Sequence, residues 1–401
     1  MIAQGPQRPA GPLIAFAGGG TGGHLYPAIA IAEAIRRCVP NARFVIFGTQ
    51  RPIDNRILSG VGCDIVRQVL PALSPIPWRW PSIYLGLRRS ASRCRSRFES
   101  DPPVVVIGTG GMASVPAVRE AHRMGIPTAI LNPDALPGRA NRHLAGIADV
   151  VFAQWDDTVQ RYPHGTDVRV LGCPIRPGFN TVGLASVPDA RQQRSQKSAR
   201  FSLQPDRKTL LVTGASQGAR SINEAVIANL DLLESLPGWQ VLHLTGEKDH
   251  ADTAAAYRDR SLAAAVIPYT DHMADALSIA DLVISRAGAS TLAEITAMGR
   301  ASILMPYPYH GDQHQLANAK CLARALAARI VRDAIDPAIN GPALRRVLGE
   351  LLTDDAARDA MSAAARRIGR GNSAADIAKQ VLCLGEKPGG DRAPDSVEAT
   401  C

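Results

Sequence analysis

Glycines gather around a histidine near the start of the chain. The segment GGGTGGH at residues 18–24 holds five glycines in seven positions and ends at His24. Because glycine has no side chain to block access, the backbone N–H groups of such a loop can approach an anion or a sugar. A lone histidine at a helix entrance usually caps the helix, but the adjoining glycines favour a general base that faces a ligand. We therefore predict that His24 is catalytic.

Two further glycine-containing loops follow apolar runs. GASQGA at 214–219 carries Ser216 and Gln217 at the start of a predicted helix, where free amides and the helix dipole favour phosphate oxygens. The alternative is an ordinary strand-to-helix turn. GTGGM at 108–112 is either another ligand-facing turn or a tight turn for packing. Both alternatives stay open for each loop.

The second half of the chain holds two polar segments that could bind a nucleotide sugar. SRAGASTLAEI begins a predicted helix, so the amides of 288–291 can meet a pyrophosphate. Glu294 either complements the helix dipole or accepts hydrogen bonds from both hydroxyls of a ribose. In HGDQHQLANA, Gln315 and Asn318 lie about one helical turn apart and offer paired donors and acceptors to sugar hydroxyls, or else form a polar cap.

Several familiar motifs are missing from the sequence. It has no Asp-x-Asp pair that could clamp a metal on a pyrophosphate and no phosphate-binding P-loop, whereas GASQG at 214–218 does match the bare Gly-x-Ser-x-Gly pattern. GGGTGG resembles the dinucleotide fingerprint only weakly, since no convincing acidic residue follows the second predicted strand. A triphosphate hydrolase and a nicotinamide enzyme are therefore disfavoured, and helix ends must balance phosphate charge.

Composition is that of an ordinary globular protein. The 401 residues are 46% hydrophobic and 20% charged, and this length favours two domains. The 45 basic and 36 acidic residues give a net charge of +9, which attracts anions. Seven scattered cysteines without a Cys-x-x-Cys pair argue against a disulfide framework and a structural zinc site. No signal peptide or long apolar run is visible, so we expect a protein kept inside the cell.

Short apolar runs alternate with helical patterns from Leu13 onward, which predicts parallel strands joined by crossover helices. The runs are LIAFAG, RFVIFG, VVVIG, TAIL, VVFA and VRVLG, then LLVTG, VLHLTG, AVIPY, LVIS and SILMPY. A first helix is expected from about Pro27 to Arg37, and helices from Gly341 to Leu384 close the chain.

Both halves open with a strand, a glycine-rich turn and a helix. We therefore predict an α/β protein of two Rossmann-like, doubly wound parallel-sheet domains. Ligands bind outside the carboxyl ends of parallel strands, so the two sheets should face each other across a cleft that holds the active site. The expected parts are a first domain at 12–177, a polar linker at 178–206, a second domain at 207–370, a closing helix at 371–385 packed back on the first domain, and a flexible tail at 386–401.

Residues 70–98 combine aromatic and apolar side chains with several arginines. Aromatics suit a membrane interface, and each arginine near an anionic surface contributes on the order of 1 kcal/mol. The alternative is a core-packing loop followed by a solvated basic helix. Nucleic-acid binding is a weaker option, because nothing else resembles a recognition module, and no nucleic-acid partner is expected.

Together these segments resemble the MurG family, glycosyltransferases of family 28 that add N-acetylglucosamine to lipid I to make lipid II in peptidoglycan synthesis. The resemblance runs from about residue 13 to 384 and rests on GGGTGGHLYPAIAIAE, GTGGMASVP, LGCPIRP, GASQGARSIN, SRAGASTLAE and GDQHQLANA. It implies a B-type glycosyltransferase fold and inverting transfer from UDP-N-acetylglucosamine to the 4-hydroxyl of an undecaprenyl-linked muramyl pentapeptide. It also implies donor binding without a metal or other cofactor.

The resemblance assigns roles to single residues. His24 matches the histidine that helps to deprotonate the acceptor, Glu294 the ribose-binding acid, and Thr270 the contact with uracil. The positions matched to the donor are Thr21, Gly22, Gly23, Arg176, Ser216, Gln217, Thr270, Gly288, Ala289, Ser290, Thr291, Glu294, Gln315 and Asn318. The positions assigned to the acceptor are Gly110, Gly111 and Asn141.

Residues 70–98 lie where the family carries its membrane-facing patch, which implies peripheral association with the anionic inner leaflet, on the cytoplasmic face. One loop departs from the family, whose His-Glu-x-Asn is here Leu131, Asn132, Pro133 and Asp134. This change keeps open a related transferase with another nucleotide sugar or lipid acceptor. A nucleotide-sugar epimerase and a UDP-sugar-binding protein without turnover are further alternatives.

Overall fold

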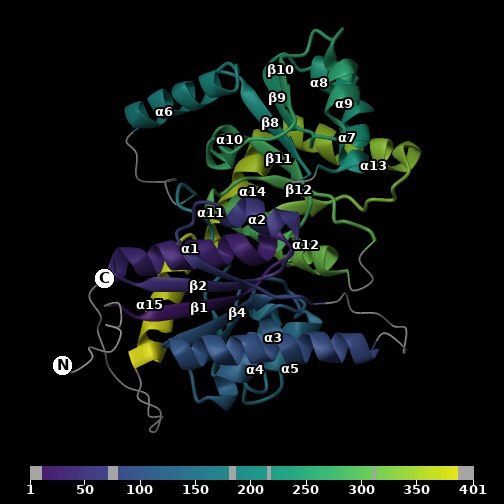
Figure 1. Ribbon diagram of the computed structural model, residues 1–401. Helices are drawn as coiled ribbons and strands as arrows, with labels where there is room; N and C mark the ends of the chain where they lie inside the picture. The colour runs from purple at the N-terminus through teal and green to yellow at the C-terminus, as the bar shows by residue number, and fades with distance from the viewer. Residues whose placement is uncertain (1–10, 71–79, 180–186, 215–217, 310–312, 387–401) are drawn as a thin grey trace, which may run out of the picture. The chain divides into compact units, whose positions relative to one another are not determined.

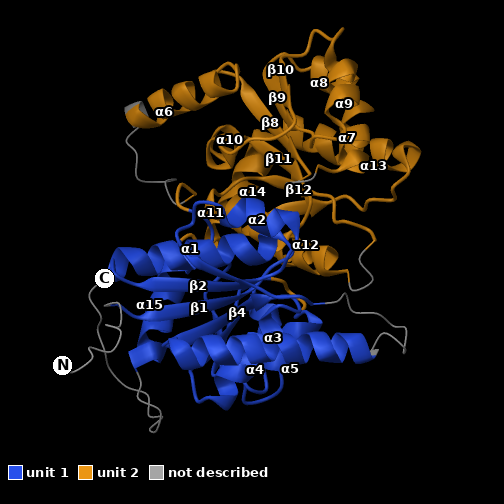
Figure 2. Cartoon of the chain, in the orientation of Figure 1, with its two compact units in different colours: residues 1–133, 137–176, 372–401 blue, residues 134–136, 177–371 orange. Residues whose placement is uncertain are grey.

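The computed structural model describes residues 11–70, 80–179, 187–214, 218–309 and 313–386, and the structural statements below concern these residues. The chain divides into two compact units (Figure 2). Unit 1 is formed by residues 1–133, 137–176 and 372–401. Unit 2 is formed by residues 134–136 and 177–371.

Unit 1 contains a seven-stranded parallel sheet whose strand order is β3-β2-β1-β4-β5-β6-β7. The strands are β1 (Leu13–Gly18), β2 (Arg43–Gly48), β3 (Asp64–Arg67), β4 (Val105–Gly110), β5 (Thr128–Asn132), β6 (Val150–Ala153) and β7 (Val168–Val170). The central strands are buried along their whole length, which explains their continuous apolar sequences.

Helices cover both faces of this sheet (Figure 1). They are α1 (Gly22–Cys38), α2 (Pro52–Leu58), α3 (Trp80–Ser100), α4 (Ser114–Arg123), α5 (Arg139–Leu144), the short 3-10 helix η2 (Asp156–Arg161) and α15 (Ser373–Glu386). One core packs α1 and α15 against the sheet, and a second core packs α3, α4 and α5 against its other face. In the second core the Phe98 ring of α3 meets Phe47 edge to face at 5.4 Å.

Unit 2 repeats the design with six parallel strands in the order β10-β9-β8-β11-β12-β13. The strands are β8 (Lys208–Thr213), β9 (Trp239–Leu244), β10 (Ala264–Ile267), β11 (Leu282–Ser285), β12 (Ser302–Leu304) and β13 (Ala328–Ile330). Its helices are α6 (Val187–Arg200), α7 (Arg220–Ile227), α8 (Leu230–Glu234), α9 (His250–Tyr257), α10 (Met273–Ile279), α11 (Ala289–Ala297), α12 (His314–Arg324), α13 (Pro337–Thr353) and α14 (Asp355–Ile368).

Strand order reverses once in each sheet, between β1 and β4 in unit 1 and between β8 and β11 in unit 2. At the first point Gly18 pairs with Gly110, and at the second Thr213 pairs with Ser285. Ligands bind at such switch points in doubly wound sheets, because loops from neighbouring strands leave on opposite faces there. The loop after β1 therefore begins beside the loop after β4, and the loop after β8 begins beside the loop after β11.

Two elements differ from the sequence predictions. Helix α1 begins at Gly22 rather than near Pro27, so the proline lies inside it. As the sixth helical residue, Pro27 removes one backbone hydrogen bond, the one that its N–H would otherwise donate to the Gly23 carbonyl. The short edge strands β3 and β13 were not predicted, since neither is a long buried apolar run.

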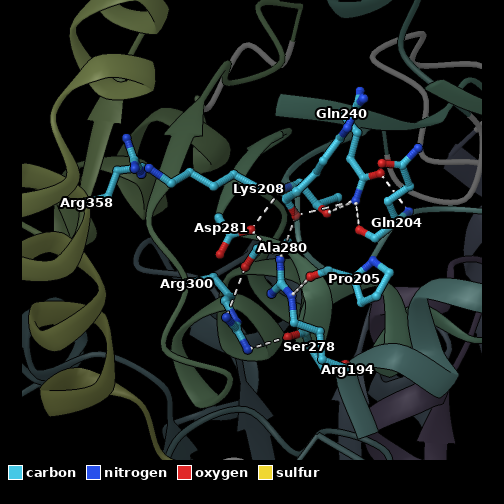
Figure 3. Close-up of polar contacts among 12 residues, drawn as sticks. Arg194, Gln204, Pro205, Lys208, Gln240, Ser278, Ala280, Asp281, Arg300 and Arg358 are labelled. Carbon is cyan, nitrogen blue, oxygen red and sulfur yellow. Dashed lines mark hydrogen bonds and ion pairs between the residues drawn. The ribbon is translucent and has the colours of Figure 1, made fainter. Parts of the chain in front are cut away.

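The polar stretch at 178–206 contains helix α6, which ion pairs attach to unit 2. Arg194 donates from Nε to the Pro205 carbonyl and from Nη2 to the Arg207 carbonyl and to Asp281 Oδ2 at 2.8 Å (Figure 3). Lys197 and Arg200 lie near Asp275 of α10. The same close-up shows Arg300 donating to the carbonyls of Ser278 and Ala280.

A fully buried histidine ties β9 to two helices of unit 2. His243 Nε2 lies 3.0 Å from Asn223 Oδ1 in α7, and Nδ1 lies 3.0 Å from the Tyr257 hydroxyl in α9. Asn223 uses its amide nitrogen to donate to the Thr245 carbonyl, so its Oδ1 accepts from Nε2–H of the ring. Burial lowers the pKa of His243 to about 3, which keeps the ring neutral.

The depressed pKa of His243 predicts acid sensitivity. Unfolded histidine binds a proton below about pH 6.5, whereas the folded ring does so only near pH 3. Between these values the free energy of unfolding should fall with decreasing pH, by about 1.4 kcal/mol per unit more steeply than in His243→Gln. Urea unfolding at pH 7, 6 and 5, followed by circular dichroism, measures both slopes. Equal slopes would contradict the assignment of a neutral buried ring.

Candidate active site

The first glycine loop fixes both the place and the protonation of His24. β1 ends at Gly18, the loop turns through Gly20 with φ +82°, and α1 starts at Gly22. His24 Nδ1 lies 2.9 Å from the carbonyl oxygen of Gly19. Because a carbonyl can only accept, Nδ1 carries a proton, and in the neutral ring Nε2 therefore presents a lone pair. The ring is half-buried, and this tautomer can accept a proton from a ligand hydroxyl at Nε2.

The loop after β4 lies against the His24 ring. A Cβ atom added to Gly110 would come within 2.8 Å of His24 Cδ2, and one added to Gly111 would come within 3.3 Å of Cε1. Both glycines have positive φ, at +113° and +73°. Only glycine can combine this backbone geometry with this close approach. Three predicted site residues are thus brought together at the switch point of unit 1.

Two other predicted residues of unit 1 lie in different surroundings. The Arg176 guanidinium stacks over the Tyr26 ring of α1 with a carbon-to-centroid distance of 4.8 Å. Asn141 is buried in α5, where Nδ2 donates to the Leu131 carbonyl and to Asn132 Oδ1. Asn141 therefore holds the end of β5, and its Oδ1 has no hydrogen-bond partner among the described residues.

The predicted phosphate-binding elements of unit 2 leave the sheet at its own switch point. Gly288 caps α11, and the half-buried Ser290, Thr291 and Glu294 follow in the first turns of the helix. After β8, Gly218 packs on the end of β9, since an added Cβ would lie 2.3 Å from the Thr245 carbonyl oxygen. Ser216 and Gln217 lie outside the described residues. Thr270 precedes α10, and its Oγ1 accepts from the backbone N–H of His272.

A buried ion pair that sequence reasoning missed supports this switch point. Arg286, between β11 and α11, donates from Nη1 to Asp333 Oδ2 at 2.6 Å and from Nη2 to Ser221 Oγ at 2.9 Å. Its guanidinium also lies over the Tyr307 ring. Burial alone would raise the pKa of Asp333, but hydrogen bonds from Ser221, Arg286 and Asn340 outweigh it and hold this pKa below its usual value. The sequence did carry a signal for Arg286, because it is a charged residue between a buried strand and a glycine.

The two amide residues of α12 make internal contacts. Gln315 Oε1 accepts from the backbone N–H groups of Ala287 and Tyr307. Asn318 is fully buried: its Oδ1 accepts from Ala135 N at 2.8 Å, and its Nδ2 donates to Asp134 Oδ1 at 2.8 Å. Asn318 thus anchors residues 134–136 within unit 2, and Gln315 links the residue before α11 to Tyr307 through its Oε1.

In the described part of the chain, no three His, Cys, Asp or Glu side chains gather as they would around a metal ion. No helix in it is both long enough and apolar enough to cross a bilayer.

The two doubly wound units and their glycine-lined switch points define the B-type class of glycosyltransferases. The N-terminal domain model of glycosyltransferase family 28 matches residues 14–153, and the C-terminal domain model matches residues 209–381. The chain therefore belongs to glycosyltransferase family 28.

Known proteins of this family are similar over nearly their whole length. The UDP-N-acetylglucosamine--N-acetylmuramyl-(pentapeptide) pyrophosphoryl-undecaprenol N-acetylglucosamine transferase of Thermodesulfovibrio yellowstonii is 34% identical over 379 residues, with 92% of this chain and 98% of the relative covered. The enzyme of the same name from Syntrophus aciditrophicus is 35% identical over 373 residues, with the same coverage. The crystal structure of Acinetobacter baumannii MurG matches with a TM-score of 0.74 at 25% identity, covering 93% of this chain and 99% of that one.

The burial of Asn318 predicts that its removal costs stability. Asn318→Ala leaves Ala135 N–H and Asp134 without these partners, which should lower the free energy of unfolding by about 1–3 kcal/mol. Urea unfolding of both proteins measures the loss. Unchanged stability together with a raised KM for the nucleotide sugar would instead place Asn318 on the ligand.

Proposed function

We propose that the chain transfers N-acetylglucosamine from UDP-N-acetylglucosamine to the muramyl residue of undecaprenyl-pyrophosphoryl-muramyl pentapeptide, which converts lipid I into lipid II. This is the reaction in the name of the relatives that share about a third of its residues. The observation that carries the proposal is the His24 ring, lodged between two glycine loops with its Nδ1 held by the Gly19 carbonyl.

The chemistry follows from that orientation. Nε2 of His24 accepts the proton of the acceptor 4-hydroxyl, and the resulting oxygen nucleophile attacks the anomeric carbon in line. The bond from that carbon to the phosphate oxygen breaks, UDP leaves, and the α configuration becomes β. Charge that grows on UDP is balanced by backbone amides at 288–291 and by Arg176, which stabilise the transition state more than the ground state.

The remaining roles are divided between the units. In this proposal unit 1 binds the lipid acceptor at Gly110, Gly111 and Asn141, with Thr21, Gly22, Gly23 and Arg176 reaching the donor. Unit 2 binds UDP-N-acetylglucosamine. Glu294 accepts from the ribose hydroxyls, Thr270 meets the uracil, and Gln315 donates to the sugar through Nε2. Ser216 and Gln217 are assigned to the diphosphate.

Transfer of labelled N-acetylglucosamine to a short-chain lipid I analogue tests the proposal. Product should form with and without EDTA, and UDP-glucose or UDP-N-acetylgalactosamine should not compete. His24→Ala should lower kcat by about 100-fold, the effect of losing a general base, with the Kd for donor nearly unchanged.

Other outcomes point elsewhere. Full turnover by His24→Ala would remove the histidine from the chemistry. Donor binding without transfer would favour another acceptor, for which the changed Leu131–Asp134 loop is the structural reason, or a protein that only binds the nucleotide sugar. Inversion of the sugar carbon that carries the acetamido group, without transfer to the acceptor, would indicate an epimerase.

The acceptor is a lipid, and unit 1 carries a surface suited to its membrane. A groove of about 640 Å³ lies between α3 and α4. Its lining combines apolar, polar and charged side chains from both helices: Tyr84, Leu87, Arg88, Ala91, Ser92, Arg95, Val115, Pro116, Arg119, Glu120 and Arg123. Glu120 pairs with Arg95 and Arg123, which leaves Arg88 and Arg119 as the arginines of the groove outside these pairs. Tyr84 in the groove and Leu85 beside it are 59% and 52% exposed. We assign this surface to the anionic inner leaflet, which places the enzyme peripherally on the cytoplasmic face.

Loss of charge from the groove should weaken membrane binding. Arg88→Ser with Arg119→Ser removes two charges of about 1 kcal/mol each, so affinity for vesicles containing one-third phosphatidylglycerol should fall by about 30-fold. Sedimentation with the vesicles measures it, and Arg346→Ser, an exposed arginine of α13, is the control. Equal binding by the double variant and the control would contradict the assignment.

A further inference from the structure

Asp54 and His24 bind opposite ends of one peptide group. The backbone N–H of Gly20 donates to Asp54 Oδ1 at 2.7 Å. The carbonyl of Gly19 accepts from His24 Nδ1 at 2.9 Å. This carbonyl and this N–H belong to the same planar trans peptide unit, so they point in opposite directions. A continuous hydrogen-bonded chain therefore runs from the carboxylate through the peptide to the imidazole.

The carboxylate is itself fixed. Asp54 is 1% exposed in the first turn of α2, and its Oδ2 accepts from Thr49 N at 2.8 Å and from Thr49 Oγ1 at 2.7 Å. Gly19 permits the contact, because a Cβ there would lie 2.4 Å from Oδ2. From the outer side, Arg51 Nη1 donates to the Gly20 carbonyl at 3.3 Å. The peptide is thus held against a buried anion that cannot turn away.

We propose that Asp54 is a positioning residue for His24 and acts through the Gly19–Gly20 peptide. A negative charge on the N–H end of a peptide draws its electrons toward the carbonyl oxygen, and hydrogen bonds in such a chain strengthen one another. The carbonyl becomes a better acceptor for Nδ1–H. This fixes the ring orientation and the tautomer whose Nε2 faces the acceptor, and it stabilises the imidazolium that forms when Nε2 takes the proton.

The arrangement has the logic of the aspartate that orients a catalytic histidine directly, with one peptide group between the two side chains. It rests on the proposed function, because it assumes that His24 is the base. It adds a residue that touches neither substrate. The same buried carboxylate would otherwise serve only to fold the loop, and the experiments below separate the two roles.

A matched carboxylate exists in the same unit. Asp149 Oδ2 accepts from the backbone N–H of Thr128 at 2.8 Å and from Thr128 Oγ1 at 3.1 Å, the same pair of donors that Thr49 offers to Asp54. Asp149 directly precedes β6 and Thr128 is the first residue of β5, so both lie at the amino ends of strands. This edge is opposite the glycine loops, so Asp149→Asn removes a similar structural contact without reaching His24.

The first test measures the tautomer of His24 by NMR. With ¹⁵N-labelled histidine, the His24 signals, assigned by their loss in His24→Ala, should show the neutral Nδ1–H tautomer in the wild-type protein. In Asp54→Asn the population of this tautomer should drop, while Asp149→Asn should leave it unchanged. A wild-type ring protonated at Nε2, or equal tautomer populations in both variants, would overturn the proposal.

The kinetic test uses the same two variants. Asp54→Asn should lower kcat by about 10- to 100-fold, the usual loss when a partner that orients a histidine is removed, with the KM for UDP-N-acetylglucosamine little changed. Asp149→Asn should keep kcat within about twofold. If Asp54→Asn does not fold, Gly19→Ala displaces the same peptide by contact with Oδ2 and should produce the same two effects.

The outcomes separate this proposal from the proposed function. Normal kcat in Asp54→Asn, beside an inactive His24→Ala, would remove Asp54 and leave the transferase assignment intact. Absence of transfer in the wild-type protein would remove the function, whereas the tautomer measurement would still report whether Asp54 governs the ring.

Discussion

Close approach of backbone at a sheet's switch point is the constraint on which this structure depends. Where strand order reverses, loops from neighbouring strands leave on opposite faces and a crevice opens between them. In unit 1 the ring of His24 occupies that space, so Gly110 cannot carry even a methyl group. In unit 2 Gly218 meets the Thr245 carbonyl beyond the neighbouring strand β9, so it cannot carry a side chain either. The glycines are therefore required by geometry before any ligand is considered.

Most of the fold was predictable because its central strands are buried on both faces and appear as apolar runs. The edge strands β3 and β13 were not, since short and partly exposed strands have no such signature. Pro27 misled the start of α1, because proline favours a first turn but also tolerates a place slightly further in. Helix α6 was not predicted, because it is held by polar residues whose partners lie far away in the sequence. Asp281, for example, is 87 positions from Arg194.

The residues of the site also fall into two groups, those that a local sequence pattern predicts and those that it does not. Glycine loops are visible as local patterns, and the switch-point rule then brings His24 to Gly110 without further information. Asp54 and Arg286 act through residues 34 and 47 positions away, which no local pattern shows. Dinucleotide-binding folds carry an acidic residue after the second strand that binds a ribose. Here the acid after β2 is Asp54, which turns inward to the glycine loop instead of outward to a sugar.

The loop that departs from the family keeps its hydrogen-bonding chemistry by exchanging two side chains. The family's His-Glu-x-Asn offers a carboxylate and then an amide, whereas Asn132 and Asp134 offer an amide and then a carboxylate. Asn132 Oδ1 accepts from Asn141 Nδ2, and Asp134 Oδ1 accepts from Asn318 Nδ2. Carboxylates and amides both offer an acceptor oxygen, so the exchange leaves an acceptor at each of these two positions. It moves the negative charge by two positions along the loop, and Leu131 removes the imidazole of the family's histidine, so an effect on substrate choice comes from the charge, from the lost imidazole or from both.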